Sequence, residues 1–443
     1  MEHSSRRFRT WWLVLILCVG AAAASPLFAL TDEEIFRDFR FNLSNPGARS
    51  LGLGGAFIAV ADDATASLAN PAGLMLLARP EFFTEIRYSN VDSSSIEQNL
   101  GGSASITSST EPMKSLSPSF LSYVHPFKRF ALGFSRVELI NTSNVTSNQF
   151  ALPFDPNNPS ILFLLGGSGR IETTVSVWNL SGAVKLLDKL SLGATATFGF
   201  IDMRAGVSNV FTNTDPNDPV YNIPQTLYDT SIDDTDTDVS FNVGLHWRPF
   251  NKISFGAVYR GGLRFELEEK IFNDGFFGGG ISAGMGSPLS TTLNTPDSYG
   301  AGVSYRPLNA LTLSLDWVHI MYTDILDGFQ GGLNVLTLFD PEAKFTVEDA
   351  DEWHFGAEYV FSAGTIPWAA RAGAYSDHNS RIYADFANGF SSFSTNDSFP
   401  PRDTVTHYTI GTGVVVKERF QIDAAADISE IANEFVLSTI FRF

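Results

Sequence analysis

The chain has 443 residues, of which only 17% are charged, and it carries a formal net charge of −19. This acidic balance argues against nucleic-acid binding, which requires a basic surface. A mean hydropathy of +0.03 excludes a bundle of membrane-spanning helices, each of which needs roughly 18 apolar residues in succession. The 38 phenylalanines and 37 glycines are instead typical of strands that are apolar on one face and small or polar on the other.

The chain begins with a predicted signal peptide. Three arginines precede an apolar stretch at residues 11–19, and small residues follow it, which is the order of an export signal. We expect a signal peptide at residues 1–24, although cleavage after Ala29 also fits the sequence. The single cysteine, Cys18, lies in this stretch, so the exported chain would contain no disulfide.

Residues 25–80 do not alternate like a strand and are rich in glycine and alanine. Glycine permits tight turns and close approach of two backbones. We therefore predict a compact N-terminal hatch that lies inside the lumen of a barrel formed by residues 81–443. The residues that we expect to shape this hatch are Gly52, Gly54, Gly55, Asp62, Asp63, Asn70, Pro71, Ala72 and Gly73.

From residue 81 onward the sequence alternates with the period of two that marks β-strands. Large apolar residues occupy one face of residues 190–200, and serine, threonine and glycine occupy the other. We count about fourteen strands, an even number as in single-chain bacterial barrels. Their approximate spans are 81–90, 118–127, 129–140, 171–187, 189–205, 237–248, 252–268, 296–306, 311–322, 351–361, 367–378, 404–417, 419–429 and 434–443.

Short turns alternate with long connections along these strands. Six connections, such as Pro126–Arg129 and Leu187–Lys189, are short, and nearly all the others are long. This asymmetry is typical of an outer-membrane barrel with both termini in the periplasm. The predicted fold is thus all-β and transmembrane, an antiparallel outer-membrane β-barrel of about fourteen strands with an N-terminal lumenal hatch.

Several segments resemble the FadL family of outer-membrane transporters for long-chain fatty acids and other hydrophobic compounds. They are Gly47–Gly52, Ala61–Ala64 and Asn70–Gly73 in the hatch, and Pro296–Pro307, Asp351–Tyr359 and Arg371–Gly373 in the barrel. The resemblance implies a channel through which hydrophobic molecules diffuse, with a hatch in the lumen and a lateral opening in the wall. The hatch motif also looks like secretion-associated barrels such as PorV, so a barrel that acts through protein partners is the alternative.

The resemblance also implies a kink in the third strand, where the wall opens sideways. In this chain the third strand is predicted at 129–140, and Gly133 is the candidate for the kink. The alternative is that Gly133 only fills a lumen position where a larger residue would clash.

Two groups of residues are candidates for contact with a hydrophobic substrate. Exposed apolar loop residues often mark a binding surface, and this group contains Phe211, Phe272, Phe276 and Phe277. A fatty-acid carboxylate needs a donor such as arginine, and Arg260, Arg264 and Arg371 fall on the lumen face by strand parity. Pairing of these arginines with the lumen acids Asp316, Glu358, Asp423 and Asp427 is the other role that parity allows.

No catalytic signature occurs in the sequence, and we predict neither an enzyme nor a cofactor. The acidic run Asp233–Asp238 could bind calcium, but a solvated extracellular loop is favoured, so we assign no metal site. The expected partners are outer-membrane lipid, lipopolysaccharide and a hydrophobic small molecule such as a fatty acid. We expect a monomer in the bacterial outer membrane.

Overall fold

The computed structural model describes eleven segments of the chain. Within the described part, no helix has the length and apolarity needed to span a bilayer. The predicted signal peptide, Phe276 and Phe277 lie outside the described residues. The described residues are 43–91, 95–101, 104–110, 113–155, 158–214, 223–272, 289–328, 344–378, 383–385, 404–430 and 432–443.

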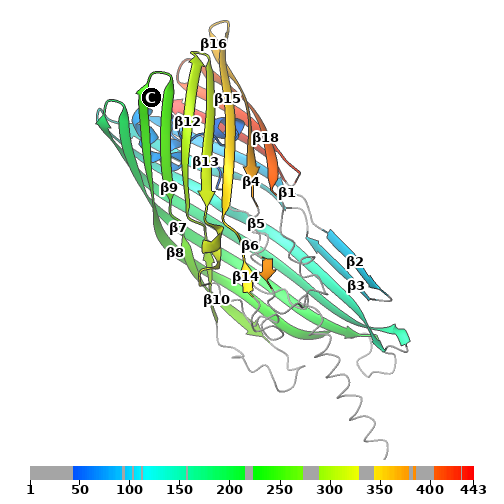
Figure 1. Ribbon diagram of the computed structural model, residues 1–443. Helices are drawn as coiled ribbons and strands as arrows, with labels where there is room; N and C mark the ends of the chain where they lie inside the picture. The colour runs from blue at the N-terminus through cyan, green and yellow to red at the C-terminus, as the bar shows by residue number, and fades with distance from the viewer. Residues whose placement is uncertain are drawn as a thin grey trace, which may run out of the picture.

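The strands form a closed antiparallel barrel of fourteen strands, as predicted (Figure 1). The barrel closes where the first strand pairs with the last, from Glu81↔Arg442 to Val91↔Ala432. Two of the fourteen barrel strands are broken into pairs of shorter strands, β9 with β10 and β11 with β12. The barrel consists of β1 (Glu81–Val91), β4 (Met113–Pro126), β5 (Phe130–Asp155), β6 (Asn158–Leu187), β7 (Leu190–Asn213), β8 (Gln225–Phe250), β9 (Ile253–Arg260), β10 (Arg264–Phe272), β11 (Leu289–Asn294), β12 (Ser298–Leu308), β13 (Leu311–Ile320), β15 (Ala350–Ala363), β16 (Ile366–Asp377), β18 (Val405–Val416), β19 (Phe420–Ile428) and β20 (Ala432–Arg442).

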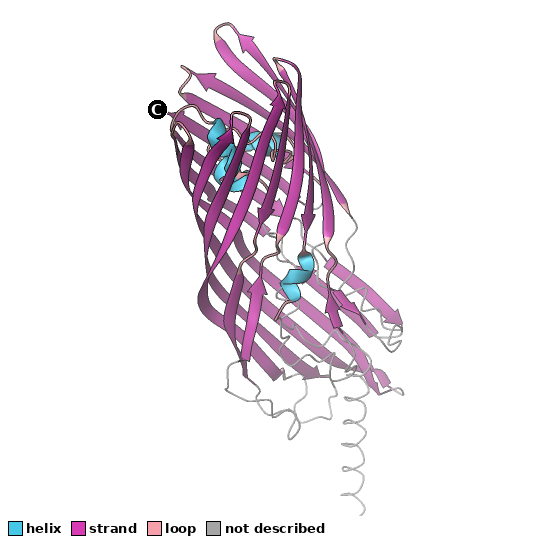
Figure 2. Cartoon of the chain, turned by 60° about the vertical axis from the view of Figure 1, so that its left-hand side comes forward, coloured by secondary structure: helices cyan, strands magenta, loops and turns pink. Residues whose placement is uncertain are grey.

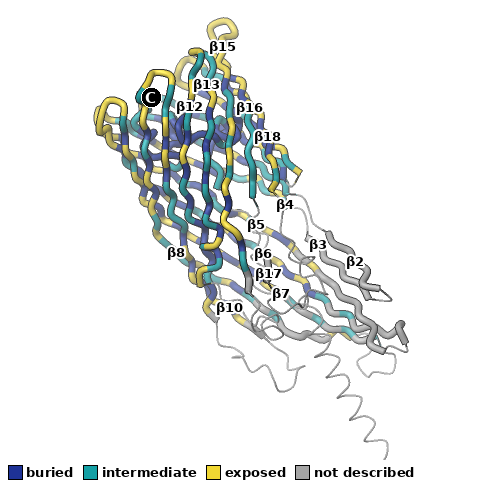
Figure 3. Tube along the Cα trace, in the orientation of Figure 1, coloured by how far each residue is buried: buried dark blue, intermediate teal, exposed yellow. Residues whose placement is uncertain are grey.

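Buried and exposed residues alternate along the strands (Figure 3), and near the short turns the exposed ones are large and apolar. In β7, Leu192 and Phe198 are exposed on the outer surface, whereas Ser191 and Thr195 are buried against the contents of the lumen. Such an apolar outer surface is what a strand needs in contact with lipid. All six predicted short turns are present, and they lie at the same end as the C-terminus (Figure 1). We call this the short-turn end.

The N-terminal segment, residues 43–80, lies inside the barrel near the short-turn end (Figure 2). We call it the lumenal segment. It contains two short α-helices, α3 (Ala48–Gly52) and α4 (Ala66–Ala69), and the 3-10 helix η1 (Pro71–Leu76). The side chain of Asn70 caps η1 by accepting from the Ala72 amide, and Pro71 occupies the first helical position, where its missing N–H costs nothing.

On the side away from the short turns, the barrel contains more strand structure than the sequence predicted. Strands β5 to β8 continue well beyond their predicted limits, and a hairpin of β2 (Ser95–Gly101) and β3 (Ala104–Thr110) pairs with the far part of β5 (Figure 1). A 3-10 helix, η2 (Tyr322–Leu326), follows β13, and β14 (Lys344–Thr346) and β17 (Tyr383–Asp385) form a separate small sheet.

The acidic run Asp233–Asp238 belongs to β8, so its prediction as a loop was wrong. Its side chains replace part of the backbone ladder between β8 and β10. The carboxylates of Asp234, Asp236 and Asp238 accept from the amides of Glu268, Glu266 and Arg264 at 2.9, 2.7 and 2.7 Å. No group of three or more His, Cys, Asp or Glu side chains that could hold a metal ion occurs in the described segments.

Candidate functional site: a closed lumen and a break in the wall

The lumenal segment contacts the barrel through a belt of glycines on successive strands. A Cβ atom at Gly193 would lie 2.3 Å from the Pro71 carbonyl carbon, and one at Gly256 would lie 2.4 Å from the Ile58 oxygen. Because no Cβ can come so near, only glycine allows these backbone contacts. The belt consists of Gly193, Gly244, Gly256, Gly302, Gly356, Gly373 and Gly411. The lumenal segment therefore fits the inner wall without room for a larger side chain.

Buried ion pairs attach the same segment to the wall. Arg49 contacts Asp62 within the segment and pairs with Glu358 of β15 at 3.0 Å. Glu358 also accepts from Arg371 of β16 at 2.7 Å, and Arg371 reaches Asp423 of β19 at 2.8 Å. Four of these five side chains are at most 14% exposed, so removing one partner would leave another charge buried without compensation.

Several of the predicted hatch residues contact the barrel wall. Gly52 faces Gly411 and Arg371, Gly54 lies against the backbone of Phe355 and Ala374, and Gly55 lies against His354. Asn70 donates to the carbonyl oxygens of Ile58 and Leu245 at 2.9 and 3.1 Å.

The remaining hatch residues hold the segment together or contact the wall. Asp63 accepts from the Thr65 amide at 2.9 Å, and burial raises its pKa even though Arg49 opposes that shift. Ala72 accepts from Ser191 at 2.9 Å, and Gly73 allows η1 to approach the Ala61 carbonyl.

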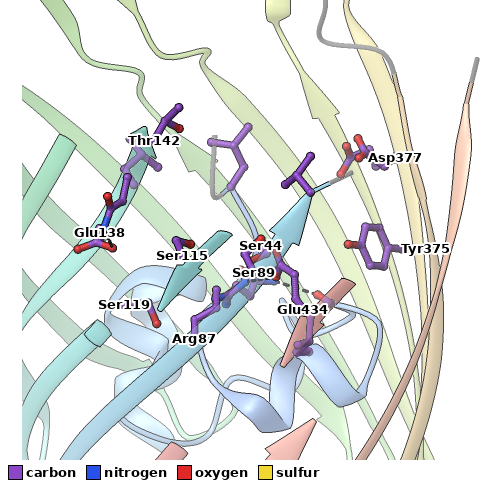
Figure 4. Close-up of a pocket in the computed structure, with 18 of the residues that line it drawn as sticks. Ser44, Arg87, Ser89, Ser115, Ser119, Glu138, Thr142, Tyr375, Asp377 and Glu434 are labelled. Carbon is purple, nitrogen blue, oxygen red and sulfur yellow. Dashed lines mark hydrogen bonds and ion pairs between the residues drawn. The ribbon is translucent and has the colours of Figure 1, made fainter. Parts of the chain in front are cut away.

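A cavity of about 210 Å³ lies against residues 43–55 of the lumenal segment (Figure 4). Most of its lining residues carry a polar group, although apolar atoms make up the larger part of the lining surface, and an ion-paired cluster lies at its centre. Arg87 of β1 pairs with Glu434 of β20 at 2.7 Å and with Glu85 at 3.1 Å, and it donates to Ser44 at 3.1 Å. The apolar lining is formed by Leu43, Leu51, Met113, Leu139, Val318, Ile320 and the ring of Tyr322, with Val91 beside them.

The barrel wall is interrupted beside this cavity. Strands β4 and β5 pair from Phe120↔Val137 to Pro126↔Ala131, but residues 113–119 of β4 and 138–145 of β5 have no backbone pairing with each other. Residues from both edges line the cavity. We call this gap the window.

The sequence around the window explains why the ladder ends there. Pro118 has no N–H to donate, and Pro118 and Ser119 together lie opposite Ile86 of β1, which is a bulge. On the other edge, Leu139 has no partner on β6, where the register shifts between Glu138 and Ile140. Two bulges face each other, so the strands separate.

Arg136 connects the two edges at the base of the window. Its guanidinium donates to the Pro118 carbonyl oxygen of β4 at 2.8 Å and to Ser176 Oγ of β6 at 2.9 Å. It also lies 3.4 Å from Glu138, which in turn accepts from Asn141 at 2.9 Å. Sequence analysis did not single out Arg136, because its hydrogen bonds are to β4 and β6, and these contacts cannot be recognised from the sequence of β5 alone.

The three predicted arginines have different environments. Arg371 is buried between Glu358 and Asp423, as the pairing alternative allowed. Arg260 lines the cavity and donates to Asn45 Oδ1 at 2.7 Å and to the Ala69 oxygen at 2.8 Å, and it makes no ion pair within the described residues. Arg264 faces outward and is 68% exposed, so its predicted place in the lumen was wrong. The break at residues 261–263 shifts the strand by one residue, which moves side chains to the opposite face.

The structure does not place the wall irregularity at Gly133. That residue pairs regularly with Val124 on one side and Ser181 on the other, and the register shift in β5 falls at Leu139. A Cβ at Gly133 would lie 3.3 Å from Val124 and 3.6 Å from Leu74 of the lumenal segment.

Phe211 and Phe272 were predicted in loops, but they lie in β7 and at the end of β10, and their side chains are not described.

Comparison with known proteins decides which family this barrel represents. Residues 41–431 match the family model described as outer membrane protein transport protein (OMPP1/FadL/TodX). The chain belongs to this family. It follows that the barrel is a bacterial outer-membrane protein from a family of transport channels for hydrophobic compounds rather than of enzymes.

Solved structures of the family have the same fold. A FadL homologue from Pseudomonas aeruginosa superimposes with a TM-score of 0.61 at 15% identity, over 91% of this chain and 99% of that chain. The toluene transporter TbuX of Ralstonia pickettii gives a TM-score of 0.56 at 15% identity, with the same coverage of both chains. The toluene transporter TodX of P. putida gives 0.54 at 14% identity, again over 91% and 99%. Among curated proteins, no sequence matches the chain.

Proposed function

We propose that this barrel takes up hydrophobic molecules, including long-chain fatty acids, and releases them sideways through the window between β4 and β5. The observation that carries this proposal is the combination of a closed short-turn end with an interrupted wall at the same cavity. The glycine belt leaves no room between the lumenal segment and the wall from β7 to β18. The cavity, by contrast, reaches both edges of the window.

The outer surface below the window suits release into lipid. Leu132 and Phe134 of β5 and Leu180 of β6 are exposed on the apolar outer face, between the window and the short turns. Outer-membrane barrels place their short turns in the periplasm. A molecule that leaves through the window would therefore meet the membrane without crossing the lumenal segment.

Arg260 is our candidate for binding a carboxylate. Arg49, Arg87 and Arg371 are each paired with acidic side chains, whereas Arg260 makes no ion pair in the described segments and donates to the Asn45 and Ala69 oxygens, with Asp316 as an acid near it. A partly buried cationic donor that is not engaged in an ion pair favours an anionic ligand. The carboxylate of a fatty acid has the required charge and geometry.

The test is protein-dependent uptake of labelled oleate by cells that produce the barrel, compared with cells that lack it. We expect saturable uptake that depends on the barrel. Equal uptake in the two cell types would contradict the proposal. A protein partner that co-purifies with an inactive barrel would favour the secretion-associated alternative.

A further inference from the structure

The short-turn end carries a charge opposite to that of the whole chain. The chain has a net charge of −19, yet lysine or arginine occurs in or beside every short turn except the one between β15 and β16. Within these turns, only Asp188 and Glu418 add exposed acidic side chains. Basic residues are therefore concentrated at one end of an acidic protein.

Basic residues of neighbouring turns lie side by side. The Arg248 amide donates to the Lys189 carbonyl oxygen at 2.8 Å, which places the two residues on adjacent strands at the same level. Like charges in such positions destabilise a sheet. An anion bound between them would remove this cost. The other pairs joined by the same kind of bond are Arg129 with Lys185, Lys252 with Arg306, and Arg419 with Arg442.

Acidic side chains of the barrel neutralise only some of these bases. Arg442 pairs with Glu81 at 2.7 Å, and Arg306 lies 3.7 Å from Asp62 of the lumenal segment. Three exposed bases of the turns between β6 and β7 and between β8 and β9 make no ion pair within the described residues. They are Lys189, Arg248 and Lys252, and we call them the basic site.

Hydrogen bonds between the turns hold the basic site in place. Lys189 Nζ donates to the Pro249 carbonyl oxygen at 2.7 Å, and Lys252 Nζ donates to that of Pro307 at 3.0 Å. The guanidinium of Arg248 donates to the backbone of its own turn at 3.2 Å. Ammonium and guanidinium groups have more donors than these bonds use. The remaining donors are available to a ligand outside the barrel, because all three side chains are exposed (Figure 3).

The basic site lies at the edge of the apolar outer surface. Leu187, Trp247 and Phe250 adjoin it in the sequence, and they are 65%, 46% and 64% exposed. Apolar and aromatic side chains at the end of a transmembrane strand lie near the level of the lipid headgroups. Lysine and arginine beside them can reach a headgroup while their stems cover apolar surface. This mixture of residues fits a lipid better than it fits a soluble acidic protein.

We propose that the short-turn end binds anionic phospholipid of the inner leaflet, with the phosphate of one headgroup held by the basic site. Arginine binds phosphate through paired N–H donors, and lysine adds a point charge. The acyl chains would lie on the adjoining apolar surface, and the other like-charged pairs would extend the lipid-binding surface around the barrel. This inference does not depend on what the barrel transports, so it can fail while the proposed function stands.

The test compares phosphatidylglycerol with phosphatidylcholine of the same acyl chains, which differ in net charge. The purified barrel in an uncharged detergent is titrated with each lipid, and bound lipid is counted by native mass spectrometry. We expect at least about fivefold tighter binding of phosphatidylglycerol at low ionic strength, because one basic residue near an anionic surface contributes roughly this factor. The preference should shrink in about 0.5 M NaCl, which screens exposed charges. Equal affinities, or a preference that salt does not change, would overturn the inference.

A triple variant tests the basic site itself. Lys189→Gln, Arg248→Gln and Lys252→Gln together remove three charges and keep a hydrogen-bond donor at each position. The matched control removes three exposed arginines from the part of the barrel away from the short turns, and it combines Arg170→Gln, Arg204→Gln and Arg264→Gln. We expect the triple variant to lose most of the preference and the control to keep it. Full preference in a triple variant that assembles correctly, as judged by heat-modifiability, would overturn the inference.

An acidic protein is the other partner with a suitable charge. Poly-glutamate, a soluble polyanion without acyl chains, is therefore added to the same detergent-solubilised barrel and to the triple variant. We expect weak binding of poly-glutamate, because it cannot use the apolar surface beside the bases. If poly-glutamate binds through the basic site while the two phospholipids bind equally, the surface serves an acidic protein and the inference is wrong.

Discussion

Gly373 of β16 and Gly54 of the lumenal segment are in direct backbone contact, and a Cβ at Gly373 would lie 2.3 Å from the Gly54 nitrogen. We predict that Gly373→Ala displaces the lumenal segment, because overpacking of this kind costs about 1–3 kcal/mol. The expected result is leakage of small polar solutes through the barrel, measured as raised conductance in planar bilayers. Gly206→Ala is the control, since nothing lies within 4 Å of a Cβ there. Conductance equal to that of the control would show that the contact does not hold the lumen closed.

Arg49 provides a second attachment of the lumenal segment. Arg49→Met leaves Asp62 with Arg306 alone and Glu358 with Arg371 alone, and loss of one partner of a buried pair costs about 3–5 kcal/mol. We expect faster hydrogen exchange in residues 43–80 and unchanged exchange in the barrel strands, measured by mass spectrometry. Adding Glu358→Gln should slow the exchange again, because Arg371 then faces one buried carboxylate, Asp423, and no longer two. Unchanged exchange in the single variant would refute this attachment.

Arg260 and Arg371 should respond differently to the same substitution. Arg260→Met should weaken oleate binding about ten- to a hundredfold, as expected for the loss of a charge-assisted hydrogen bond, without loss of assembled barrel. Arg371→Met should instead lower the yield of assembled barrel, because it leaves Asp423 buried without its cation. Arg264→Met is the outward-facing control. Titration of the purified proteins with oleate and heat-modifiability on gels measure the two effects, and normal oleate affinity in Arg260→Met would remove that residue from the site.

Arg136 should control how far the window opens. Arg136→Met removes the bonds to the Pro118 oxygen and to Ser176, so the two edges are free to separate. We predict faster protein-dependent uptake of oleate than in the wild type. Arg170→Met, which removes a fully exposed ion pair with Glu172, is the control and should leave uptake unchanged. A slower rate in Arg136→Met would mean that the residue helps the substrate through rather than restraining the edges.

Features set by neighbouring residues could be predicted from the sequence. Period-two alternation and turn chemistry are local, so the strand number and the short turns were correct. The Gly- and Ala-rich composition of the lumenal segment likewise indicated close packing, and glycines of the wall contact its backbone. Farther from the short turns, however, the alternation inverts, so that apolar residues point inward and polar residues outward: in β7, Ile201 and Met203 are buried, whereas Asp202 and Arg204 are exposed.

Features that depend on pairing between distant strands were missed. The face of Arg264 is determined by the slip at residues 261–263, which the Asp238 carboxylate stabilises from another strand. The window depends on Pro118 in β4 lying beside Leu139 in β5, and neither residue is unusual in its own strand. Pro118 is the first residue of the predicted strand 118–127, where proline is allowed, so the sequence contained no warning of the break.

The lateral route is tested most directly by blocking the window. Ser117→Cys in a Cys18→Ser background is reacted with a bulky maleimide, and oleate uptake is measured before and after labelling. Thr174→Cys, on the exposed outer face of β6, is the matched control. We predict that the label abolishes uptake through Ser117→Cys and leaves Thr174→Cys unaffected. Full uptake by labelled Ser117→Cys would show that the substrate leaves the barrel by another path.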